Sequence, residues 1–167
     1  MSTTTAANTT TTVDNPTGLE SRVLNEGYGP GAWHGADLKA ALAGVTPALA
    51  FWRPAAGRHN IAEIALHHAY STRAVRAQMS GVPAEPFVRE GEDWFDLPDE
   101  QALTWEEVRA TVDREQRRLA ALVADIEAAT AQSPLADAER FNLALGITCH
   151  AIYHAGQVQL IKRLRGE

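Results

Sequence analysis

Two of the six histidines in the chain, His150 and His154, have a spacing that suits a bound metal ion. Four residues of an α-helix turn through about 400°, so these side chains lie one turn apart and about 40° apart around the axis. Apolar residues continue the same face at three- and four-residue steps: Leu143, Ile147, Val158 and Ile161. Two adjacent imidazoles on an inward face are costly to bury unless their nitrogens are satisfied, and a divalent ion satisfies them directly.

The histidine pair also has an ordinary structural explanation. Inward-facing histidines are often hydrogen-bonded core residues, and the pair lacks the glutamate of the familiar His-Glu-x-x-His zinc motif. The spacing alone therefore leaves two interpretations open, a metal site and a purely structural bundle whose histidines belong to the core.

A metal site needs a third ligand, for which the adjacent His67 and His68 are the candidates. The helical stripe of this segment consists of Ile61, Ala65, Thr72, Val75 and Met79. It places His68 near its centre and His67 to one side. Because a ligand at the mouth of a pocket can lie at the edge of such a stripe, the pattern leaves both histidines open.

Four segments with helical periodicity are expected to position these residues. They run over about 36–52, 61–79, 104–126 and 137–164. No segment shows the period-two alternation of a sheet for more than a few residues. The sequence therefore predicts an all-α fold, an up-down four-helix bundle.

Local signals mark the helix ends. Asn60 with Glu63, and Thr104 with Glu107, have the spacing of a capping box, in which each side chain satisfies a free N–H of the first turn. These pairs predict helix starts near residues 60 and 104. Pro47 interrupts the first segment and predicts a break or kink there.

Residues 81–103 form a long crossover between the second and third predicted helices. The segment contains three prolines and three aromatic residues: Pro83, Pro86, Pro98, Phe87, Trp94 and Phe95. A connection of this length is unusual in a compact domain and is often functional. Two interpretations are open, a flap over a pocket and a crossover strapped to the bundle by its aromatic side chains.

Composition narrows the classes of partner. The chain has 167 residues and a net charge of −6, and this acidic balance argues against a nucleic-acid partner, which needs clustered Lys and Arg. The single cysteine, Cys149, excludes an intramolecular disulfide and a Cys-rich zinc site.

Length and patterning suggest one domain. Residues 1–18 are rich in Thr and Ala, and we expect them to form a flexible tail before a bundle domain over 19–167. This tail lacks the basic start and apolar core of a secretory signal, and no run approaches the roughly 20 apolar residues that span a bilayer. We therefore expect a cytoplasmic protein with no membrane partner.

Two stretches resemble the DinB/YfiT-like metalloenzyme family. The run from His150 to Val158 resembles the family's His-x-x-Tyr-His-x-Gly-Gln-Ile signature. Residues 60–67 resemble its second-helix pattern, in which Glu or Gln stands four residues before a ligand histidine. By this resemblance the third ligand is His67, and His68 stands where the family usually has an aliphatic residue. The Trp33-His34-Gly35 sequence is also similar to one branch of the family.

The resemblance implies a bundle in which His67, His150 and His154 hold one divalent ion, Zn²⁺ or Ni²⁺, with further positions open to water or substrate. It also implies a homodimer and, as activity, thiol-dependent transfer using a low-molecular-weight thiol, or hydrolysis, on a small-molecule substrate. The substrate is not indicated. The alternative function is a non-catalytic metal- or ligand-binding bundle related to stress.

Other polar residues near the motifs have weaker signals. Gln157, one turn beyond His154, is expected either to orient a ligand or to lie at a subunit contact. Tyr153 points about 100° away from the histidine pair and is expected to pack on a neighbouring helix. Cys149 is expected to be a small packing residue, and His34 is expected to be exposed, with a role near the metal as the alternative.

Overall fold

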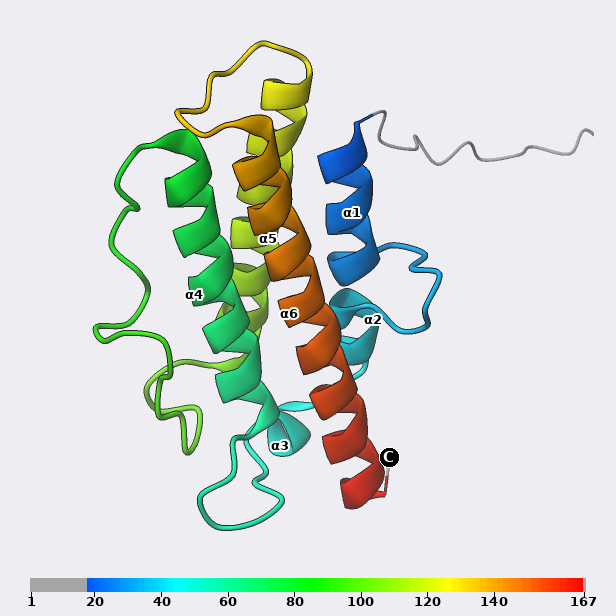
Figure 1. Ribbon diagram of the computed structural model, residues 1–167. Helices are drawn as coiled ribbons and strands as arrows, with labels where there is room; N and C mark the ends of the chain where they lie inside the picture. Colours follow the sequence, from blue (N-terminus) through cyan, green and yellow to red (C-terminus); the bar gives the residue numbers. More distant parts are fainter. Residues whose placement is uncertain (1–17, 167) are drawn as a thin grey trace, which may run out of the picture.

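The computed structural model describes residues 18–166, which contain six α-helices and no strand (Figure 1). The helices are α1 (Leu19–Tyr28), α2 (Leu38–Leu42), α3 (Pro47–Ala50), α4 (Ile61–Ser80), α5 (Trp105–Glu127) and α6 (Asp137–Arg165). The predicted all-α class is confirmed. All but the last residue of the expected tail, 1–18, lies outside the described part of the chain.

Four of the helices form the bundle. α4 packs against α5 and α6, and α1 packs against the same two helices from the other side. Ser133 Oγ donates to the Met79 carbonyl at 2.6 Å, so the end of α4 lies beside the connection between α5 and α6. The crossover between α4 and α5 therefore returns to the end of the bundle where α4 began, and these two helices run parallel (Figure 1). α1, α4, α5 and α6 run down, up, up and down, so the helical bundle is confirmed but the strict alternation of an up-down bundle is not, because the long crossover makes α4 and α5 parallel.

The first helix of the bundle differs from the sequence prediction. The segment 36–52 forms two short helices, α2 and α3, and α1 takes the bundle position instead. The predicted break at Pro47 is confirmed: α2 ends at Leu42, and Pro47 occupies the first turn of α3, where a missing N–H is tolerated and Thr46 Oγ1 caps the turn. α1 was missed because only Leu24 and Tyr28 give it buried apolar side chains.

A small residue brings α1 close to α6. A Cβ built on Gly27 would lie 3.1 Å from both the Ala151 Cβ and the Thr148 Cα. Thr148 Oγ1 also donates to the Val23 carbonyl at 3.1 Å. The pairing of these helices thus rests on close backbone approach rather than on a wide apolar stripe, which explains why its sequence signal is weak.

The start of α4 is fixed by the predicted capping box. The Asn60 side chain accepts from the Glu63 N–H at 2.9 Å, and Glu63 accepts in return from the Asn60 N–H. Both side chains also reach the crossover: Asn60 Nδ2 donates to the Leu97 carbonyl at 2.7 Å, and the Leu97 N–H donates to Glu63 Oε1 at 2.9 Å. The capping box therefore holds the crossover as well as the helix.

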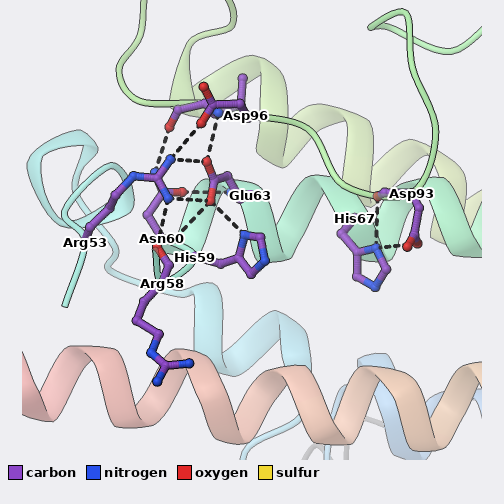
Figure 2. Close-up of polar contacts among 9 residues, drawn as sticks. Arg53, Arg58, His59, Asn60, Glu63, His67, Asp93 and Asp96 are labelled. Carbon is purple, nitrogen blue, oxygen red and sulfur yellow. Dashed lines mark hydrogen bonds and ion pairs between the residues drawn. The ribbon is translucent and has the colours of Figure 1, made fainter. Parts of the chain in front are cut away.

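Glu63 is buried at the centre of a polar network (Figure 2). Arg53 donates to both of its carboxylate oxygens and to Asp96, and His59 Nδ1 lies 3.0 Å from its Oε2. Burial alone would raise the pKa of Glu63, but the hydrogen bonds from Leu97, Arg53 and His59 outweigh it and lower the pKa. The carboxylate is thus kept charged and paired.

No helix among residues 18–166 is both long and apolar enough to cross a membrane.

We expect Glu63→Ala to lower the free energy of unfolding by about 3 kcal/mol, because it leaves the Arg53 charge and the Leu97 N–H without their buried partner. Glu107→Ala removes the corresponding glutamate of the capping box of α5, which is exposed, and serves as the matched control. Urea unfolding measures the loss of unfolding free energy in each of the two variants. Equal losses in the two variants would show that the network around Glu63 adds nothing to its cap.

Candidate metal centre

Three histidine side chains meet between α4 and α6. His150 Nε2 lies 3.0 Å from His67 Nε2 and 3.1 Å from His154 Nε2. A divalent ion bound at about 2.0–2.1 Å, with angles between octahedral and tetrahedral, separates its nitrogen ligands by about 2.9–3.4 Å. The observed spacing therefore fits three imidazoles that share one ion.

Two of the three rings have their other nitrogen fixed as a donor. His154 Nδ1 lies 2.6 Å from Gln157 Oε1, an amide oxygen that can only accept. His67 Nδ1 lies 2.9 Å from the Asp93 carbonyl oxygen and 3.0 Å from the Asp93 carboxylate. Since each Nδ1 carries the proton, each Nε2 presents a lone pair to the cluster.

The third ring is fixed through His68 and Thr72. The Thr72 hydroxyl donates to the His68 carbonyl at 2.8 Å, so its oxygen accepts from His68 Nε2 at 3.3 Å. His68 Nδ1 is then an acceptor, and it lies 3.1 Å from His150 Nδ1, which donates to it. His150 Nε2 therefore presents a lone pair as well. Three nitrogen lone pairs point at one another with no proton between them, an arrangement that a cation satisfies.

The structure brings His67 together with His150 and His154, and it places His68 behind His150. Both residues of the adjacent pair are buried, which is why periodicity could not choose between them. His68 faces the bundle interior, as expected from its central position in the stripe. His67 lies at the edge of the stripe, and its side chain is the one that joins the cluster.

The crossover supplies one wall of the centre. The Trp94 indole stacks on the His67 ring, with centroids 3.9 Å apart, and on the His59 ring at 3.8 Å. Two imidazoles at these distances do not fit on one face of an indole, so Trp94 lies between them. Asp93, which binds His67, has a φ of 63°, in the left-handed region that Asp tolerates better than most residues.

Of the two interpretations of the crossover, the contacts support the one in which its aromatic side chains hold it on the bundle. Its aromatic side chains strap it to the bundle: the Phe87 and Phe95 rings lie 5.4 and 5.6 Å from the ring of Tyr70 on α4. The same segment covers the histidine cluster with Asp93 and Trp94. The contact between Asp93 and His67 was not predicted from the sequence, because no periodic pattern predicts the position of a loop residue. The aromatic residues of the segment were the only sequence signal that it packs on the bundle.

The weaker expectations have mixed outcomes. Gln157 orients His154. Tyr153 does not pack on a neighbouring helix: it is 63% exposed, and its hydroxyl accepts from Gln157 Nε2 at 3.1 Å. Cys149 is exposed, so its predicted packing role is wrong. His34 is exposed at the α1–α2 connection, where Nε2 lies 2.8 Å from the Glu26 carbonyl, and it takes no part in the cluster.

The environment keeps the imidazoles of His68, His150 and His154 neutral. Burial, followed by the neighbouring His154 and His67, lowers the pKa of His150 to about 4. Burial also lowers the pKa of His154, and it lowers the pKa of His68 well below the usual value. Neutral imidazole is the form that binds a metal ion, so at neutral pH these side chains need lose no proton to do so.

An all-α bundle with convergent histidines on facing helices is a familiar class of metal-binding scaffold. The family model of the DinB superfamily matches residues 32–158, and the chain belongs to that superfamily. Its members are typically metal-binding, and the cluster of His67, His150 and His154 is compatible with this property. Neither a search of curated proteins nor a search of solved structures finds a significant match.

The lowered pKa values predict how the stability of the metal-free protein depends on pH. Below the ordinary histidine pKa of 6.5, His68 and His150 bind protons in the unfolded chain but stay unprotonated in the folded protein, where their pKa values are lower. Stability is therefore fully present above pH 6.5 and falls as the pH is lowered towards about 4. Urea unfolding in a chelator between pH 6.5 and about 5, above the range of ordinary carboxylates, measures this slope.

His68→Leu removes one of these histidines, and the slope in this variant should be shallower than in the parent. An unfolding free energy that does not change over the window, or an identical slope in His68→Leu, contradicts the prediction.

Proposed function

We propose that the protein is a divalent-metal-dependent enzyme whose metal ligands are His67, His150 and His154. The observation that carries the proposal is the convergence of three Nε2 lone pairs whose tautomers are all set by outer partners. A structural zinc site normally closes with four protein ligands, whereas three histidines leave positions for water and substrate, as in catalytic sites. Zn²⁺ and Ni²⁺ both suit imidazole ligands.

The outer partners come from three separate segments. Gln157 holds the Nδ1 proton of His154 from within α6, Asp93 holds that of His67 from the crossover, and His68 holds that of His150 from α4. Such partners orient the ligand rings and raise their basicity, and their loss typically weakens metal binding by about 10- to 100-fold. A core that merely buried its histidines would not need every tautomer to expose the same nitrogen.

The reaction class we propose is thiol-dependent group transfer or hydrolysis on a small-molecule substrate. A divalent ion in the cluster supplies Lewis acidity, which activates either a low-molecular-weight thiol or water as the nucleophile. Trp94 excludes water from the face of the cluster that it covers, because its indole stacks on His67. Asp93 and Gln157 accept the Nδ1 protons of His67 and His154, respectively, so that Nε2 of each ring is free to bind the ion.

Elemental analysis of the purified, untagged protein tests the ligand set. We expect about one equivalent of a divalent ion in the parent, and none in the double variant His150→Ala/His154→Ala, because one ligand cannot hold the ion. His34→Ala removes an exposed histidine outside the cluster and should retain the ion. Far-UV circular dichroism checks that all variants are helical. A double variant that keeps its metal would overturn the assignment.

The open coordination position is tested on the same protein loaded with Co²⁺. Addition of 2-mercaptoethanol should produce a thiolate-to-cobalt charge-transfer band if a thiol can reach the ion. A spectrum unchanged by thiol, together with no turnover in a hydrolase screen, would favour the non-catalytic binding function.

The His68–Thr72 pair gives a separate prediction for metal affinity. His68→Leu should weaken Zn²⁺ binding by roughly 10- to 100-fold, since it leaves the His150 Nδ1–H without an acceptor. His68→Gln should recover most of the affinity, because its amide oxygen can accept from His150 and its NH₂ can donate to Thr72. Competition with a chromophoric chelator measures the Zn²⁺ affinity of the parent and of the two variants. Equal affinities for parent and His68→Leu would limit His68 to a packing role.

A further inference from the structure

A groove of about 540 Å³ lies beside the histidine cluster, between the end of α6 and the loop before α4. Volumes of this order are typical of small-molecule sites. Its apolar wall includes Ile64, Leu160, Ile161 and Leu164. Ile64 and Ile161 are buried in the core, but Leu160 and Leu164 are 57% and 60% exposed. Two large, exposed leucines one turn apart form an apolar surface that the described chain does not cover.

The groove has an unusual charge for this protein. No Asp or Glu among residues 18–166 lines it, although the chain carries 21 acidic and 15 basic residues. Its ionisable lining residues are Arg58 and His59. The groove therefore combines an apolar wall with a basic rim.

Arg58 is the unengaged member of a pair of nearby arginines. The Arg53 guanidinium is used by Glu63 and Asp96, whereas that of Arg58 has no hydrogen bond or ion pair to any residue within 18–166. In Figure 2 the Arg58 side chain extends away from Glu63 and towards α6, on the side of the groove. An unpaired guanidinium at the edge of an apolar surface is suited to a carboxylate or a similar anion.

Two lining residues connect the groove to the histidine cluster. Gln157 accepts from His154 Nδ1, and the His59 ring stacks on Trp94, which stacks on His67. The Gln157 end of the groove therefore lies beside the cluster, and Trp94 separates His59 from His67.

We propose that this groove binds a small organic anion, its carboxylate or similar group on Arg58 and its apolar body on Leu160 and Leu164. As the substrate class of the enzyme, the assignment rests on the proposed metal-dependent function. The binding itself depends only on the groove.

The test is an NMR titration of the metal-free protein with hexanoate, 1-hexanol and hexylammonium. Hexanoate should give saturable shifts at residues of the groove, including the Gln157 side-chain amide, and should bind more tightly than the alcohol or the amine. Arg58→Gln should weaken hexanoate binding roughly tenfold, because a hydrogen bond to a charged group is lost, and leave 1-hexanol unchanged. The matched control is Arg163→Gln, an exposed arginine of α6 that does not line the groove.

Three results would overturn the proposal: equal binding of the three probes, hexanoate binding unaffected by Arg58→Gln, or no saturable shift. In the last case sedimentation velocity identifies a competing occupant, since a dimer that Leu160→Glu dissociates would mean that a second copy of the chain covers the groove. Working without metal separates the two proposals. If hexanoate binds but elemental analysis finds no ion, only the metal-dependent function is rejected. If the ion is found but hexanoate does not bind, only the proposal for the groove is rejected.

Discussion

The structure depends on a single electrostatic constraint, the meeting of three nitrogen lone pairs at His150 Nε2. Two imidazole nitrogens about 3 Å apart normally share a proton, one as donor and the other as acceptor. Here each ring has its proton drawn to the opposite nitrogen by a partner outside the cluster. A positive charge would relieve the repulsion among the lone pairs, and the contacts around the cluster keep these nitrogens in place.

The constraint links the crossover to the bundle. The Asp93 backbone fixes His67, and the crossover that carries it is anchored a few residues later, where Leu97 pairs with Asn60 and Glu63 at the start of α4. The same helix therefore provides one histidine of the cluster and the anchor of the segment that orients this histidine. This arrangement explains a connection of such length in a small domain, because the crossover must run back along α4 (Figure 1). It must also place Asp93 and Trp94 against His67.

The sequence predicted those features that are encoded locally. The i, i+4 pair of His150 and His154 and the two capping boxes depend on helix geometry alone, and the structure has them where the spacing put them. What failed depends on contacts between distant segments. α1 is held by backbone approach at Gly27, which leaves no apolar stripe to detect. His67 and His68 could not be ranked because their difference lies in what α6 and the crossover present to each of them.

The charge of the centre favours anionic partners. Imidazole ligands contribute no negative charge, so a divalent ion held by three of them would keep its full charge, offset in part by the Asp93 carboxylate that binds His67. Attraction at such a partly buried place is screened less than at the surface. The groove beside it adds Arg58 to this charge. With a divalent ion bound, this part of a chain of net charge −6 would carry a local positive charge, which would attract a thiolate or a carboxylate.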